Sequence, residues 1–192
     1  MTIPPYLQQG DTIGMLCPAG FMPLEKMQAA IDTLQQWDYK IKKGKTLGGA
    51  SKNYFSATDE ERLNDLQEMM DDKNIKAIFC ARGGYGTGRI IEKLNFKKFI
   101  KYPKWIIGFS DVTVLHSHLF SNYKIASLHA PMAAAFNDDE YKNEFVQSLH
   151  TALVGSQADY ECATHSFNRK GIAKGILVGG NLSLLAHLVG TS

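Results

Sequence analysis

Short apolar runs alternate with segments of helical periodicity along most of the chain, and this alternation limits the folds that it can adopt. Residues 12–17, 75–80 and 105–108 are the clearest apolar runs, and each is followed by a stretch with apolar side chains every three or four positions. Such alternation is typical of βα units, whose strands form a parallel sheet covered by helices. The sequence therefore predicts an α/β fold with a Rossmann-like open parallel sheet and helices on both faces.

The connecting helices are predicted from their starts and their apolar spacing. Pro23 can occupy the first turn of a helix whose apolar stripe ends near Trp37. Thr58 is followed three residues later by Glu61, which is a capping box and predicts a helix start. The expected inner face of that helix consists of Leu63, Leu66 and Met70.

The same spacing rules predict several shorter elements. Further helices are expected around residues 90–94, at 112–120, along the stripe Tyr141, Phe145, Leu149 and Leu153, and at 182–189. Further strands are expected at residues 39–42, 125–128, 159–163 and 171–178. Residues 44–54 are polar and rich in glycine, and we expect a mobile surface loop there, close to the functional site.

The spacing of the apolar residues changes after Gly155, where it becomes closer to that of β-strands. We interpret residues 1–155 as an N-terminal α/β domain, residues 156–168 as a linker, and residues 169–192 as the start of a smaller C-terminal domain that is incomplete.

Composition excludes several classes of partner. The 21 basic and 19 acidic residues are interspersed, so the net charge of +2 gives no field that would favour nucleic acid or an anionic membrane. Neither a secretory signal nor a run of roughly 20 apolar residues is present, and we expect a cytoplasmic protein. The three cysteines have irregular spacing, which fits neither a disulfide framework nor a metal site.

Ser110 lies between a predicted strand and a predicted helix, and two interpretations of it are open. A serine at a sharp strand-to-helix turn presents its hydroxyl at the ligand-binding edge of an α/β sheet, next to backbone amides that can stabilise an oxyanion. However, serine and aspartate are also preferred helix caps, and Ser110-Asp111 can be explained by capping alone. The local sequence GFSD lacks the G-x-S-x-G signature of α/β-hydrolases.

The glycine-rich segment ARGGYGTGR, residues 81–89, follows the strand at 75–80. Its glycines allow close approach of the backbone to a ligand, but its spacing matches neither a dinucleotide-binding fingerprint nor a P-loop. A carboxylate held by Arg82 and the loop amides is chemically reasonable, whereas a tight turn with a solvated arginine is the simpler alternative.

Other reactive side chains are weaker candidates. Cys80 precedes the glycine-rich segment, but a buried, unreactive thiol is the commoner situation. His116 and His118 are two positions apart on a helix and cannot bind one metal ion together. His129 follows a predicted strand and can reach the same edge of the sheet, although a hydrogen-bonded structural histidine is the commoner case. We expect neither a metal nor a cofactor.

Five motifs in the same order give the chain a specific resemblance to a known family. They are YFSATDEER at residues 54–62, ARGGYG at 81–86, PK at 103–104 with IGFSDVT at 107–113, HAP at 129–131, and GGNL at 179–182. Together they resemble the LD-carboxypeptidases of serine peptidase family S66, which include muramoyl-tetrapeptide carboxypeptidases of murein recycling and microcin-immunity peptidases.

The resemblance implies a Ser–His–Glu hydrolase with Ser110 as the nucleophile. It implies an oxyanion hole formed by the amides of Asp111 and Gly84, and Arg82 is expected to orient the substrate. The implied reaction releases D-alanine from a murein tetrapeptide by cleavage of an L-to-D peptide bond, without metal or cofactor. Thr113 and Asn181 are interpreted as structural, and a homodimer is compatible with the family.

The triad glutamate and histidine of the family belong to a part beyond Ser192, and neither can be assigned to a residue of this sequence. Because a serine without its base is a poor nucleophile, the 192-residue chain is expected to be nearly inactive by itself. Two other functions stay open at this point. One is a non-enzymatic domain that binds a carboxylate or phosphate with its glycine-rich loop, and the other is a scaffold that competes for partners of the full enzyme.

Overall fold

A computed structural model describes residues 1–49, 54–137 and 139–191, with the backbone alone over 139–143, and its centre is an all-parallel sheet. Five strands have the order β2-β1-β3-β4-β5. They are β1 (Thr12–Leu16), β2 (Lys40–Lys43), β3 (Ile75–Cys80), β4 (Trp105–Gly108) and β5 (Leu128–His129). The predicted α/β class with an open parallel sheet is confirmed.

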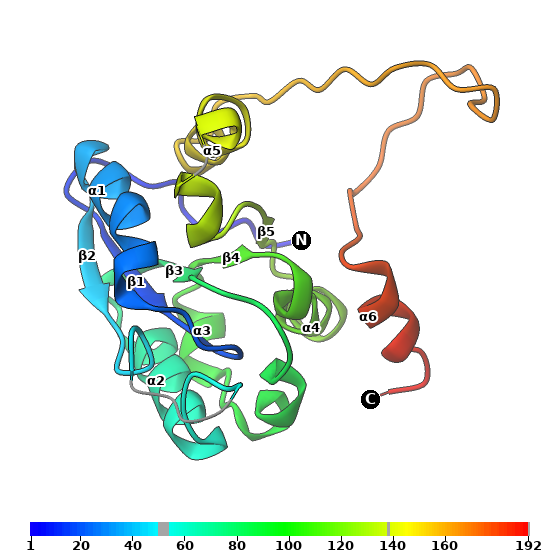
Figure 1. Cartoon of the computed structure of the whole chain (residues 1–192). Coiled ribbons are helices and arrows are strands. Elements are labelled where there is room, and N and C mark those ends of the chain that lie inside the picture. Colours follow the sequence, from blue (N-terminus) through cyan, green and yellow to red (C-terminus); the bar gives the residue numbers. More distant parts are fainter. Residues whose placement is uncertain (50–53, 138, 192) are drawn as a thin grey trace.

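Helices cover both faces of this sheet (Figure 1). On one face lie α1 (Gln28–Gln36) and α5 (Asp139–Leu153), and on the other lie α2 (Asp59–Asp71), α3 (Lys97–Lys101) and α4 (Thr113–His118). Successive residues of a strand point to opposite faces, so Phe79 enters the core beneath α1 and α5 while Ile78 enters the core beneath α2 to α4. Both strand faces are therefore apolar, as expected for a parallel sheet.

The helix starts follow the sequence signals. The Thr58 hydroxyl accepts from the Glu61 amide while the Glu61 carboxylate accepts from the Thr58 amide, which confirms the capping box at the start of α2. Pro23 precedes a 3₁₀ turn, Leu24–Met27, that continues into α1. The helix predicted at 112–120 is α4, flanked by the 3₁₀ turn Ser110–Val112 and by a π-helical turn, Leu119–Tyr123.

Several shorter predictions are wrong in position or type. Residues 90–94 form no α-helix: Gly86 has φ +149°, and the 3₁₀ turns Thr87–Arg89 and Ile91–Lys93 follow it instead. The strand predicted at 125–128 is displaced, since Ile125 forms only an isolated bridge with Thr2 and β5 is Leu128–His129. Helix α3 was not predicted, because its five residues are too few for a periodic pattern.

The loop expected at 44–54 is not a simple surface loop. Thr46 and Leu47 are buried, and the Asp65 carboxylate accepts from the amides of Lys45 and Thr46. Residues 50–53 of this prediction lie outside the described residues. In α5, Leu149 and Leu153 are buried as predicted, whereas Phe145 is exposed; Tyr141 lies among the side chains that are not described.

Residues 156–179 run mostly outside the body of the molecule and form neither of the predicted strands at 159–163 and 171–178 (Figure 1). A strand needs a neighbour to receive its backbone hydrogen bonds, and the described chain offers none beside this segment. The chain returns in α6 (Leu182–His187), which lies against α4, as Leu184 packs on the core beneath that helix. Division of the chain at residues 155 and 168 stays a prediction.

Each helix among the described residues is too short or too polar to span a bilayer.

Candidate functional site

The carboxyl ends of β1, β3, β4 and β5 meet at one edge of the sheet, where the predicted site residues lie. The chain leaves β1 for β2 on one side and resumes at β3 on the other side, so the order of strands reverses between β1 and β3. Ligands in open α/β sheets bind beside such a reversal, outside the carboxyl ends. The loops after β1 and β3 touch there, because the Gly20 amide donates to the Gly83 carbonyl oxygen at 3.0 Å.

Ser110 follows β4 in a conformation that is costly for a residue with a side chain. Its φ is +59°, in the left-handed region, and Gly108 before it has φ +153°. The Ser110 hydroxyl caps neither the 3₁₀ turn nor α4, and it has no hydrogen-bond partner among the described residues. The side chain is half-buried, with Phe109 exposed next to it. Capping therefore does not explain this serine, whereas strained presentation of a hydroxyl is the geometry of a nucleophile at a strand-to-helix turn.

The glycine-rich loop after β3 touches the Ser110 turn. A Cβ atom on Gly83 would lie 3.0 Å from Ser110 Cβ and 3.3 Å from the amide nitrogen of Asp111, so only glycine allows this approach. The Gly83 carbonyl oxygen points to Gly20. The peptide bonds of the described chain are trans, so the next amide, that of Gly84, points in the opposite direction.

Neither amide of the predicted oxyanion hole is engaged elsewhere. Within the described residues, the N–H groups of Gly84 and Asp111 donate to no acceptor. The Asp111 side chain is buried, and its carboxylate accepts from the Thr87 amide at 2.8 Å. One residue therefore leaves its backbone amide beside Ser110 while its side chain holds the glycine-rich loop.

Arg82 lies on the exposed side of the same loop. Its guanidinium has no carboxylate partner among the described side chains, and its Nε would be 3.3 Å from a Cβ atom on Gly20. Two exposed rings flank the loop: the Tyr54 hydroxyl packs against the Cα side of Gly84, and Tyr85 belongs to the loop itself. An unpaired cation, aromatic surfaces and free amides are together suited to an anionic organic group.

The histidines and cysteines separate into structural and exposed groups. His116 is buried and hydrogen-bonded, while His129 ends β5 and lies exposed, with its ring 6.1 Å from that of Phe109. No histidine in the described part of the chain reaches the Ser110 hydroxyl. Burial raises the pKa of the Cys80 thiol far above its usual range, so the cysteine alternative has no support.

Metal ligands do not converge at this edge. In residues 1–49, 54–137 and 139–191, no group of three or more His, Cys, Asp or Glu side chains could hold a metal ion. Thr113 and Asn181 contact each other: the Asn181 amide donates to the Thr113 hydroxyl, and the Asn181 side chain caps α6. Their interpretation as structural residues stays a prediction.

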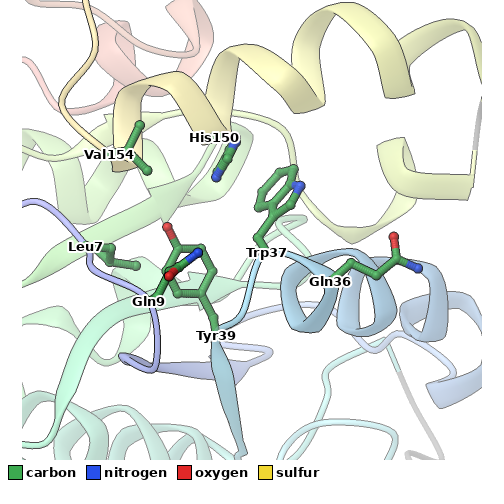
Figure 2. Close-up of a pocket in the computed structure, with 7 residues that line it drawn as sticks. All are labelled: Leu7, Gln9, Gln36, Trp37, Tyr39, His150 and Val154. Atoms are coloured by element: carbon green, nitrogen blue, oxygen red, sulfur yellow. The ribbon is translucent and has the colours of Figure 1, made fainter.

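A separate pocket lies at the opposite, amino-terminal edge of the strands (Figure 2). Leu7 and Gln9 precede β1, Tyr39 precedes β2, and His150 of α5 stacks on Trp37 at 4.3 Å between ring centres. Because the whole sheet separates this pocket from Ser110, it takes no part in the candidate site.

The sequence patterns did not reveal the role of Arg62, which is fully buried and bonded to the loops after β1 and β3. The inner face of α2 was expected at Leu63, Leu66 and Met70, but Leu63 is only half-buried. The available signals were the position of Arg62 one residue after the capping-box glutamate and its place at the end of the motif YFSATDEER.

Comparison with known proteins assigns the chain to a family. Residues 13–130 match the model of the LD-carboxypeptidase N-terminal domain of peptidase family S66. A probable murein peptide carboxypeptidase of Bacillus subtilis is 35% identical over 98% of this chain and 60% of its own length. The murein tetrapeptide carboxypeptidase of Pseudomonas aeruginosa is 29% identical over 93% of this chain, again with 60% of its own length covered. The chain thus spans about 60% of the length of these curated relatives.

Solved structures show the same architecture. The crystal structure of a muramoyltetrapeptide carboxypeptidase from Oxalobacter formigenes has a TM-score of 0.83 and 28% identity, covering 94% of this chain and 60% of that one. A microcin C7 self-immunity protein shares the fold, with a TM-score of 0.82 at 22% identity over 99% of this chain and 66% of its own. The strained serine, the glycine-rich loop and the family match lead to one conclusion: this chain belongs to the LD-carboxypeptidase family S66, and residues 13–130 correspond to the family's N-terminal domain.

Proposed function

We propose that this chain carries the nucleophile of a serine carboxypeptidase that removes terminal D-alanine from murein tetrapeptides. The observation that supports it most is the strained φ of Ser110, whose hydroxyl has no structural partner among the described residues. The names of the relatives from Bacillus subtilis and Pseudomonas aeruginosa indicate peptides of murein as the substrate class of those proteins.

The proposed first step is attack of Ser110 Oγ on the carbonyl carbon of the L-to-D peptide bond. The hydroxyl proton passes to a general base, and the negative charge on the carbonyl oxygen is stabilised by the amides of Asp111 and Gly84. When the tetrahedral intermediate collapses, the C–N bond breaks and the amine of D-alanine takes up the proton. Water then hydrolyses the acyl-enzyme and regenerates Ser110.

Arg82 is proposed to bind the terminal carboxylate of the peptide. Its exposed guanidinium can form two parallel hydrogen bonds with a carboxylate, and the adjoining glycine-rich loop leaves room for the end of a chain. A carboxypeptidase needs such a contact, because it must distinguish the last peptide bond from internal ones.

The reaction also needs a base, and no histidine of the described part reaches Ser110. The family resemblance assigns the glutamate and histidine of the triad to a C-terminal part, which we propose as the source of the base. We therefore expect the 192-residue chain alone to retain at most the residual catalysis of binding and oxyanion stabilisation, roughly 10³–10⁴ over water.

One observation favours a second function, the binding of an anionic ligand without catalysis. Arg82 and the amides of Gly84 and Asp111 are free of partners within the described residues, and a carboxylate or phosphate can use all three. Under this alternative, a ligand binds the 192-residue chain and the substitution Ser110→Ala leaves its affinity unchanged.

The decisive experiment measures release of D-alanine by the full-length gene product. Tetrapeptides that contain either diaminopimelate or lysine at the third position are compared with peptides that end in L-alanine. The proposal expects release only from the D-alanine peptides, and loss of that release in Ser110→Ala with an unchanged circular dichroism spectrum. Unchanged turnover in Ser110→Ala eliminates Ser110 as the nucleophile.

A further inference from the structure

Arg62 is a fully buried arginine in the first turns of α2, and its bonds to Pro18 and Gly86 lie outside that helix. We infer that Arg62 is a positioning residue of the Ser110 site, which fixes the glycine-rich loop after β3 against the loop after β1. The catalytic consequence of this inference rests on the proposed function, whereas its structural part does not.

The guanidinium joins three separate segments of the chain. Its Nη1 donates to the Pro18 carbonyl oxygen at 2.6 Å, after β1, and to the Gly86 carbonyl oxygen at 3.0 Å, after β3. Its Nε donates to the Ala57 carbonyl oxygen at 3.3 Å, ahead of α2, and its Nη2 pairs with the Asp59 carboxylate. Arg62 therefore links both loops that flank the reversal of strand order.

These contacts require an arginine. Only a planar guanidinium presents several donors in fixed directions, so a lysine ammonium cannot reach carbonyl groups on two loops with the same geometry. Burial of a cation is costly, and such a charge is retained only where its hydrogen bonds are satisfied. Arg62 meets this condition through the carbonyl oxygens of Pro18, Gly86 and Ala57 together with the Asp59 carboxylate.

The glycine-rich loop is held from two sides. At Gly86 the backbone has φ +149°, and a Cβ atom there would lie 2.7 Å from Nη1 of Arg62, so the loop runs in contact with the guanidinium. One residue later, the Thr87 amide donates to the Asp111 carboxylate at 2.8 Å. Gly84 is thus followed closely by Gly86 and Thr87, which are held by Arg62 and by Asp111 respectively.

Arg89 supplies a matched control. It pairs with the same Asp59 carboxylate, and its guanidinium lies 5.5 Å from the centre of the Phe55 ring, compared with 5.0 Å for Arg62. However, the Arg89 side chain is half-exposed, and its guanidinium donates to no carbonyl oxygen of the two loops among the described contacts. Loss of Arg89 removes the ion pair and the ring contact but leaves the bonds to Pro18 and Gly86.

The test measures amide hydrogen exchange of the 192-residue chain by mass spectrometry. In Arg62→Lys, the peptide covering residues 85–90 is expected to exchange about 10- to 100-fold faster, while a peptide of β3 is unchanged. In Arg89→Lys, exchange of residues 85–90 is expected to stay within about twofold of the parent. Unchanged exchange in Arg62→Lys, or an equal increase in both variants, overturns the inference.

A second variant decides the matter if Arg62→Lys does not fold. Asp59 is partly exposed, and Asp59→Asn removes the charge that orients the Arg62 guanidinium while all carbonyl acceptors stay in place. The inference expects faster exchange of residues 85–90 in Asp59→Asn than in Arg89→Lys, because Arg89→Lys leaves the Asp59 carboxylate in place beside Arg62, whereas Asp59→Asn removes its charge. Equal exchange in these two variants contradicts it.

Kinetics of the full-length protein separate this inference from the proposed function. If the parent releases D-alanine, Arg62→Lys is expected to lower kcat about 10- to 100-fold with KM within about threefold, because the loop amide acts in the transition state. A kcat in Arg62→Lys within twofold of the parent contradicts a catalytic consequence. If the parent releases none, the proposed function fails, and the exchange measurement still decides whether Arg62 positions the loop.

Discussion

His116 donates a hydrogen bond from Nε2 to the carbonyl oxygen of Gly108 at 2.9 Å, and this bond ties α4 to the last residue of β4. Because a carbonyl oxygen only accepts, the proton is on Nε2, and Nδ1 accepts from the Ser127 hydroxyl at 2.8 Å. Burial lowers the pKa of His116 to about 4. A neutral imidazole therefore holds the end of β4 through a hydrogen bond to Gly108, two residues before Ser110.

This relationship predicts a pH-dependent stability. The pKa of His116 is about 4 in the folded chain and about 6.5 when unfolded, so the unfolded state binds more protons between these values. The stabilisation is complete above about pH 6.5 and is lost as the pH falls towards 4. We expect the free energy of unfolding to fall by up to roughly 3 kcal/mol across this window, measured by urea denaturation.

The control for this effect is His116→Gln, which keeps an amide donor and acceptor but does not titrate. Its stability is expected to depend less on pH between 4 and 6.5 than that of the parent. Burial also lowers the pKa values of His118 and His150, so a smaller slope of the same sign remains. An identical slope in parent and variant contradicts the assignment to His116.

The left-handed conformation of Ser110 predicts a stability gain on replacement by glycine. A left-handed conformation destabilises a residue with a side chain by roughly 1–2 kcal/mol. Replacement by glycine removes this strain, but roughly 0.5–1 kcal/mol of the gain is offset because glycine loses more conformational entropy on folding. Ser110→Gly should therefore be more stable than Ser110→Ala by about 0.5–1 kcal/mol, measured by urea denaturation.

Asp38 provides a positive control, because it is exposed, has φ +66° and makes no side-chain hydrogen bond within the described residues. Asp38→Gly should exceed Asp38→Ala in stability by a similar amount. If glycine stabilises at position 38 but not at position 110, the turn at Ser110 is not strained, and the main support for the nucleophile assignment is lost.

Most of the sheet was predictable from the sequence, because buried parallel strands leave a local signal. The runs at β1, β3 and β4 are apolar on both faces, and Thr58 with Glu61 marks the start of α2. The strands predicted after Gly155 are wrong because the prediction used the same local signal. The apolar residues of that segment have a strand-like spacing, but a strand also needs a neighbour, which local sequence cannot specify.

The site was predictable only in part. Glycines after a strand indicate close backbone approach, and this pointed to the loop that touches Ser110. By contrast, Arg62 and Asp65 are charged residues on the inner side of α2, where hydrophobic periodicity expects Leu63. They face inward because loop carbonyl and amide groups lie opposite them, and such long-range partners leave no periodic pattern.

Asp111 has a buried carboxylate whose removal should be more harmful than its neutralisation. Asp111→Ala leaves the buried Thr87 amide without an acceptor, which is expected to cost about 1–3 kcal/mol of stability. Asp111→Asn keeps an oxygen in place and should lose clearly less. Thermal or urea denaturation of both variants checks the order, and equal losses would show that the bond to Thr87 contributes little.

The thiols are expected to differ strongly in reactivity. Burial raises the pKa of Cys17 to about 12 and that of Cys80 further, whereas Cys162 is exposed. The folded chain should thus react rapidly with maleimide at one thiol, and Cys162→Ser should abolish this labelling, as read by intact mass. All three thiols should react in denaturant. Rapid labelling of Cys80 in the folded chain would revive the cysteine alternative.

The proposed role of Arg82 gives a prediction that separates binding from chemistry. If its guanidinium holds the terminal carboxylate equally in the ground state and the transition state, Arg82→Gln raises KM about 10- to 100-fold and leaves kcat within a few-fold. The measurement is D-alanine release by the full-length protein over a range of tetrapeptide concentrations. A fall in kcat at constant KM assigns Arg82 to the transition state instead.

A substrate that ends in D-alanine amide makes the prediction sharper, because it removes the charge from the other partner of the same contact. The parent should prefer the free acid over the amide by about 10- to 100-fold in kcat/KM, and Arg82→Gln should show little preference, since the guanidinium that reads the charge is gone. Arg82→Lys should regain part of the preference, as an ammonium attracts a carboxylate without the paired geometry. If Arg82→Gln keeps the full preference, another cation binds the carboxylate and the assignment of Arg82 is wrong.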